Sequence, residues 1–91
     1  MGVWVRSQSS NWLVFASEFY IKTKDGKNGI SDVLTTDNQP LAIYSSYKKA
    51  LKVIGMIQNF IKTRVNEDMI FQMPQDEEVK LWKIGNITKM I

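Results

Sequence analysis

The side chains that could do chemistry in this 91-residue chain are carboxylates and amines, because the sequence contains no histidine and no cysteine. Histidine is the side chain best suited to proton transfer near neutral pH, and both residue types supply the usual ligands for zinc, copper and haem iron. Carboxylate pairs and all-oxygen metal sites are therefore the remaining candidates for catalysis.

The closest carboxylates are Glu67-Asp68 and Asp76-Glu77-Glu78. Adjacent acids in turns are usually solvated, whereas paired carboxylates that transfer protons or hold a metal converge from separate elements. No Asp-x-Asp-x-Asp loop of the calcium-binding kind is present. We therefore expect no enzyme activity, no metal site and no cofactor.

A second candidate is a basic surface between Asn38 and Asn66, where five basic residues occur without a single acid. On a helix, Lys48, Lys52 and Lys62 share one face, and a basic face can contact a phosphate backbone. The alternative interpretation is an ordinary solvated face, because the net charge of the chain is only +3.

Aromatic residues offer a third possibility. Trp4, Trp12 and Tyr20 fall on the less apolar face of their predicted strands, beside Arg6 and Lys22. A basic, aromatic sheet face can stack nucleic-acid bases. Cross-strand aromatic pairs that simply stabilise a small sheet explain the same pattern.

The elements that would position these residues begin with strands. Short β-prone or alternating segments are separated by polar turns, of which Lys24 to Gly29, with its Asp-Gly and Asn-Gly pairs, is the clearest hairpin. This turn leads into a strand, so it does not predict a phosphate-binding loop. The predicted strands are 3–6, 12–23, 30–35, 41–44 and 69–73.

One long helix is predicted over about residues 46–65. Ser45-Ser46 supplies an N-cap, and apolar residues from Ala50 to Val65 recur at helical spacing. Gly55 falls on the polar half, where it costs about 1 kcal/mol of helix propensity and has no evident packing reason.

Together these patterns predict an α+β fold. We expect an antiparallel meander of four or five strands, with the helix packed on one face and burying Phe15, Phe19 and Ile21. Residues 1–74 would form a single domain, and residues 75–91 a C-terminal extension for which the sequence gives no single structure.

Four short motifs stand out: the opening Trp4-Val5-Arg6-Ser7-Gln8, the helix entry Tyr44-Ser45-Ser46 with Ala50-Leu51, Ile57-Gln58 within the helix, and Met73-Pro74 followed by acids. Together they resemble a family of small uncharacterised proteins from bacteriophages, prophages and mobile elements of Gram-positive bacteria. The resemblance covers about residues 3 to 78 and implies a phage or prophage origin and a compact sheet-plus-helix domain. Because that family has no established activity, it assigns no role to any residue.

The extension beyond the acidic stretch carries Leu81, Trp82 and Ile84, which are candidates for contact with a protein partner or a second copy of the chain. They are equally well placed to pack back on the chain's own sheet.

We expect a cytoplasmic protein, since the longest apolar run is far shorter than a membrane span and the start lacks the features of a secretory signal. The leading functional hypothesis is a non-enzymatic protein-interaction module, and nucleic-acid binding is the alternative.

Overall fold

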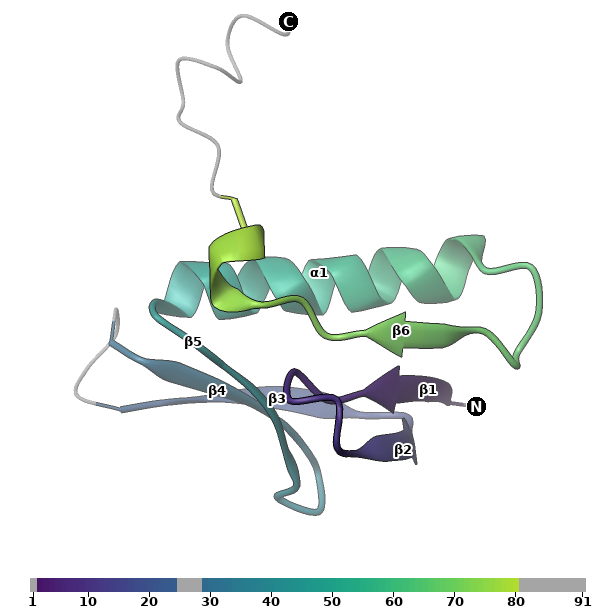
Figure 1. Cartoon of the computed structure of the whole chain (residues 1–91), viewed down its shortest axis with the longest axis horizontal. Coiled ribbons are helices and arrows are strands. Elements are labelled where there is room, and N and C mark those ends of the chain that lie inside the picture. The colour runs from purple at the N-terminus through teal and green to yellow at the C-terminus, as the bar shows by residue number, and fades with distance from the viewer. Residues whose placement is uncertain (1, 25–28, 81–91) are drawn as a thin grey trace, which may run out of the picture.

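The structure is a computed structural model that describes residues 2–24 and 29–80. It confirms the α+β class and the long helix (Figure 1). The elements, in chain order, are β1 (Val3–Arg6), β2 (Leu13–Ala16), β3 (Phe19–Thr23), β4 (Ser31–Thr35), β5 (Pro40–Tyr44), α1 (Tyr47–Thr63), β6 (Ile70–Gln72) and the 3-10 turn η1 (Asp76–Glu78).

The strands form two three-stranded sheets rather than one. Sheet A has the order β2-β1-β6, and sheet B has the order β3-β4-β5. Sheet B is the expected antiparallel meander, whereas in sheet A strand β6 returns to pair parallel with β1. The segment predicted as one strand from residue 12 to 23 is interrupted at Ser17-Glu18, and this break moves the chain from sheet A to sheet B.

The predicted hairpin joins β3 to β4. Thr23 pairs with Ser31, and the backbone N–H of Lys24 donates to the carbonyl of Ile30 at 2.9 Å. The Asp-Gly and Asn-Gly pairs expected to make the turn fall partly on residues 25–28, which lie outside the described residues.

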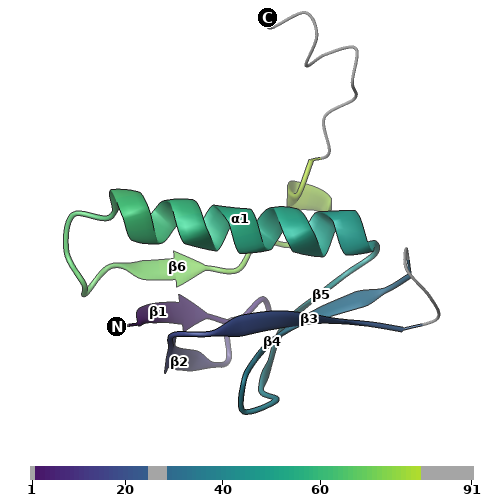
Figure 2. The same cartoon turned by 180° about the vertical axis from the view of Figure 1, so that it is seen from behind.

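Helix α1 lies across both sheets and closes the core between them (Figures 1 and 2). The Ser46 side chain caps its first turn by accepting from the N–H of Lys49 at 3.2 Å, as the sequence predicts. The buried face of the helix consists of Ala50, Val53 and Ile57. These residues pack with Val3, Val5, Val33, Ala42, Tyr44, Phe71, Met73 and Val79.

The prediction that α1 buries Phe15, Phe19 and Ile21 is correct for two of the three residues. Phe19 and Ile21 pack half-buried against the core. Phe15 is 52% exposed, because the break after β2 leaves it facing outward with its pairing partner Trp4, while Val14 faces the core.

Two further observations complete the fold. Val79 is buried in the same core, so the chain stays in contact with the domain past residue 74. Among the described residues, no helix has both the length and the apolar character needed to cross a membrane.

Replacing Ile57 by alanine should lower the free energy of unfolding by about 2–5 kcal/mol, because it leaves a cavity where the helix meets the sheets. Ile61→Ala, at a position that is 36% exposed on the same helix, is the control and should cost less than about 1.5 kcal/mol. Urea unfolding followed by circular dichroism measures both. Equal losses would contradict this assignment of the buried helix face.

Candidate functional site

The predicted basic face of the helix is only partly free. Lys48 and Lys62 are exposed, but the ammonium group of the half-buried Lys52 donates to the carbonyl of Lys80. Lys48 and Lys62 lie about 21 Å apart along the helix axis. Contact of Lys48, Lys52 and Lys62 with nucleic acid stays a prediction.

Acidic residues from η1 approach the start of the helix. Lys49 forms an ion pair with the Asp76 carboxylate at 3.3 Å and donates to the Asp76 carbonyl at 3.0 Å. The basic stretch between residues 38 and 66 therefore receives negative charge from a segment that lies farther along the chain. This proximity weakens the local positive potential that a phosphate backbone would use.

The predicted aromatic and basic sheet face is divided between two sheets. Trp4 and Arg6 lie on the outer face of sheet A, whereas Tyr20 and Lys22 lie on sheet B, and Trp12 precedes β2. The prediction that all these residues form a single stacking surface is therefore wrong. The reason is again the break at residues 17–18, which the alternating pattern of the sequence does not reveal.

A different apolar surface forms on sheet A. Register places Phe15 of β2, Trp4 of β1 and Ile70 of β6 in one row across the sheet, and Leu13 stands in the next row beside Arg6. The rings of Trp4 and Phe15 are 5.2 Å apart and tilted by 59°. Phe15 and Leu13 are each 52% exposed and Ile70 is 50% exposed. We call Leu13, Phe15, Trp4 and Ile70 the outer apolar face.

Sequence reasoning missed the outer apolar face, because Ile70 comes beside Trp4 only through the parallel pairing of β1 with β6. The composition of residues 69–73 predicts a strand, but it carries no information about which strand lies next to it. The same pairing places Gln72 beside Arg6, so the row next to the aromatic pair is polar at its centre.

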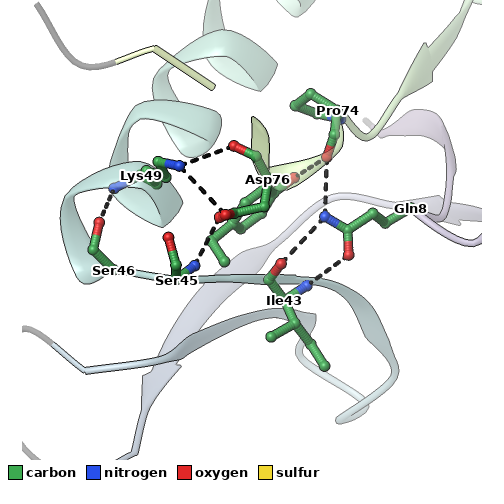
Figure 3. Close-up of polar contacts among 8 residues, drawn as sticks. Gln8, Ile43, Ser45, Ser46, Lys49, Pro74 and Asp76 are labelled. Carbon is green, nitrogen blue, oxygen red and sulfur yellow. Dashed lines mark hydrogen bonds and ion pairs between the residues drawn. The ribbon is translucent and has the colours of Figure 1, made fainter. Parts of the chain in front are cut away.

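The second constellation is a polar junction around Gln8 (Figure 3). The side-chain amide of Gln8 donates to the carbonyls of Ile43 and Pro74, each at 3.2 Å, and its oxygen accepts from the N–H of Ile43 at 3.1 Å. The backbone N–H of Gln8 also donates to the carbonyl of Leu41 at 2.8 Å. Gln8, two residues after the end of β1, thus bonds to β5 of the other sheet and to the segment that follows β6.

Other residues complete this Gln8 junction. The side chain of Gln75 donates to the Gln8 carbonyl at 2.7 Å, and the hydroxyl of Tyr44 donates to the Pro74 carbonyl at 2.8 Å. Tyr44 is fully buried, and this burial, followed by the charges of Asp76 and Glu78, raises the pKa of its hydroxyl well above the ordinary value. The hydroxyl is therefore a neutral donor at physiological pH.

Asp76 links the Gln8 junction to the start of the helix. Its carboxylate accepts from the backbone N–H of Ser45 at 2.8 Å and from the ammonium of Lys49 (Figure 3). The bond from the backbone of Ser45 is the main cause that lowers the pKa of the Asp76 carboxyl; burial opposes it, and Lys49 lowers the pKa further. The sequence motifs that contain Gln8, Ser45 and Pro74 thus meet at one place in the fold, whereas Ile57-Gln58 lies farther along the helix.

The chemistry of the Gln8 junction is structural. Its amide, hydroxyl and carboxylate groups are all bonded to partners within the chain. In the described parts of the chain, no group of three acidic side chains is placed to hold a metal ion. Leu81, Trp82 and Ile84 lie outside the described residues, so their predicted contact with a protein stays a prediction.

Comparison with protein-family models, with curated proteins and with solved structures gave no match to this chain.

Replacing Gln8 by glutamate should destabilise the fold by about 1–3 kcal/mol, because it removes a donor and sets a carboxylate against the carbonyls of Ile43 and Pro74. Gln58→Glu makes the same chemical change at an exposed helix position and should cost less than about 0.5 kcal/mol. Urea unfolding at pH 7 compares the two. A Gln8→Glu variant as stable as the parent would show that this amide does not hold the sheets together.

Acid should remove the stabilisation that Asp76 provides. Because the pKa of Asp76 is lower in the folded state, the unfolded state takes up the proton first as pH falls. The contribution is thus fully present above the ordinary carboxyl pKa of about 4 and is lost below it. Unfolding free energies from pH 7 to pH 2.5 should converge for the parent and Asp76→Asn. A constant gap between them, or an equal response in Asp37→Asn, would contradict this role.

Proposed function

We propose that this chain is a non-enzymatic protein-interaction module that binds its partner through the outer apolar face of sheet A. The observation that carries the proposal is the row of Phe15, Trp4 and Ile70, in which two half-exposed apolar side chains flank a less exposed tryptophan. Aromatic residues surrounded by apolar and polar neighbours are enriched at the centres of protein interfaces. Leu13 and Arg6 extend this surface.

The open edges of sheet A support the same proposal. The order β2-β1-β6 places β2 at one edge and β6 at the other, and neither has a further strand beside it among the described residues. The free backbone groups of an edge strand can pair with a strand from another protein. A partner that adds a strand along β2 would reach Leu13 and Phe15 at the same time.

Three expectations from the sequence belong to this proposal. The four motifs support an origin in a bacteriophage or prophage, and the partner would then be a host or phage protein in the bacterial cytoplasm. A second copy of the chain is one such partner. For Leu81, Trp82 and Ile84 the sequence leaves two sites open, a partner protein or the chain's own surface.

Nucleic-acid binding through Lys48, Lys52 and Lys62 is the alternative function. It ranks second because Lys52 is bonded to the backbone of Lys80 and because Asp76 lies beside the neighbouring Lys49. The two functions differ in their response to salt, since binding to a phosphate backbone falls steeply as the salt concentration rises.

The proposal is tested with a photo-reactive amino acid incorporated at Phe15 and, as a matched control, at Ile43, which is equally exposed but lies on sheet B. Each full-length protein is irradiated in a nuclease-treated bacterial lysate, and the adducts are identified by mass spectrometry. We expect a protein adduct at position 15 that is absent at position 43. This adduct should be lost when Ile70 is replaced by serine.

Two outcomes would contradict the proposal. Identical adducts at positions 15 and 43 would show that the outer apolar face is not selective. An adduct found only in a parallel lysate without nuclease, and lost with Lys48→Glu/Lys62→Glu but not with Ile70→Ser, would favour the nucleic-acid alternative.

A further inference from the structure

A groove of about 460 Å³ is lined by residues of α1 and β6, two elements that lie side by side in Figures 1 and 2. Its apolar lining comes from Gly55, Met56 and Phe60 of the helix and Phe71 of the strand, and Lys52 and Asn59 add polar groups. The rings of Phe60 and Phe71 meet edge to face at 5.4 Å. The groove therefore offers an apolar surface that no described residue covers.

Gly55 lines this groove, and nothing in the helix itself accounts for a glycine at this position. A glycine inside a helix costs about 1 kcal/mol relative to alanine. A side-chain carbon placed at Gly55 would meet nothing within 4 Å among the described residues, so no described neighbour requires the glycine. A glycine at such a position permits a bulky group to approach the helix backbone closely.

The described chain ends beside this groove. The ammonium of Lys52, which lines the groove, donates to the carbonyl of Lys80, the last described residue. The eleven residues that follow, 81–91, include six apolar ones and no acid: Leu81, Trp82, Ile84, Ile87, Met90 and Ile91. The occupant with the shortest route to the groove is therefore the chain's own C-terminal segment.

The spacing of the groove residues along the axis of α1 matches the reach of an extended chain beyond Lys80. Gly55 and Asn59 lie about 5 Å and about 10 Å beyond Lys52 on the helix axis. In an extended chain, Trp82 and Ile84 lie at most about 7 Å and about 13 Å beyond Lys80. An extended segment that starts level with Lys52 and runs along the groove toward the end of the helix would bring Trp82 to the level of Gly55 and Ile84 to the level of Asn59.

We propose that residues 81–91 of the same molecule dock in the groove between α1 and β6, with the indole of Trp82 lying over Gly55. The indole then covers the apolar lining formed by Phe60 and Phe71, and Gly55 is required because any side chain there would occupy the place of the ring. This docking is independent of the outer apolar face, which belongs to the opposite face of sheet A.

The absence of cysteine from the sequence permits a direct test by disulfide formation in the full-length chain. The test pair is Asn59→Cys with Ile84→Cys, which leaves Trp82 in place. The control pair is Gln58→Cys with Ile84→Cys, because Gln58 is exposed at the same height of the helix but does not line this groove. Both proteins are oxidised mildly at low concentration, and intact mass and non-reducing gels report the products.

We expect an intramolecular disulfide that forms at least about tenfold faster in the test pair, because docking raises the effective concentration of one thiol near the other. Equal rates in the two pairs, or no disulfide in either, would overturn the proposal. A product that is mainly a disulfide-linked dimer would overturn it too, since the groove would then hold the segment of a second copy.

A thermal measurement without cysteines gives an independent answer. In a Trp82→Ala background, Gly55→Ala should raise the melting temperature by about 4–8 °C, as expected for an uncovered helix position in a domain of this size. In the parent chain the same change should give no rise, because the added methyl group meets the indole. An equal rise in both backgrounds would show that Trp82 does not lie over Gly55.

Discussion

The structure depends on the side-chain amide of Gln8. Sheets A and B share no hydrogen-bonded ladder, and β5, at the edge of sheet B, presents the backbone N–H and carbonyl of Ile43 outward. The amide of Gln8 bonds to both groups, as the backbone of a neighbouring strand would, and it also donates to Pro74 beyond β6. This side chain thereby links the two sheets and the segment that leads to η1 through hydrogen bonds. The apolar core that both sheets share with the helix adds to this link.

The sequence predicts those features that local chemistry decides. Ser46 and the spacing of apolar residues place the helix within two residues of its ends, and the Asn-Gly and Asp-Gly pairs predict the hairpin that pairs Thr23 with Ser31. The pairing of β1 with β6 is not predictable in this way, because it joins residues about 66 positions apart and composition does not encode a neighbour. The outward position of Phe15 is missed because the alternating pattern does not reveal the break at residues 17–18. The Gln8 junction consists of polar residues without periodicity, so the sequence shows its members but not their meeting.

Charge shows a related effect of the fold. Along the sequence, residues 38–66 contain only basic charges, and this pattern favours a phosphate-binding face. In the fold, Asp76 comes from 27 positions beyond Lys49 to pair with it. The negative charge of η1 therefore offsets part of the positive charge at the start of the helix. The surface that differs most from an ordinary solvated surface is the outer apolar face. That surface, on sheet A, is the basis of the proposed contact with a protein partner.

The parallel pairing of β1 with β6 has a consequence for synthesis on the ribosome. Translation at about 5–20 residues per second delays β6 by several seconds after β1 has been made. During that interval β1 can pair only with β2, and an isolated two-stranded hairpin is marginally stable in water. Val3 and Val5 then lack their cover, and one edge of β1 is open. The nascent chain thus exposes an apolar strand until residues 70–72 emerge, and it is during this interval that a chaperone would have a segment to protect.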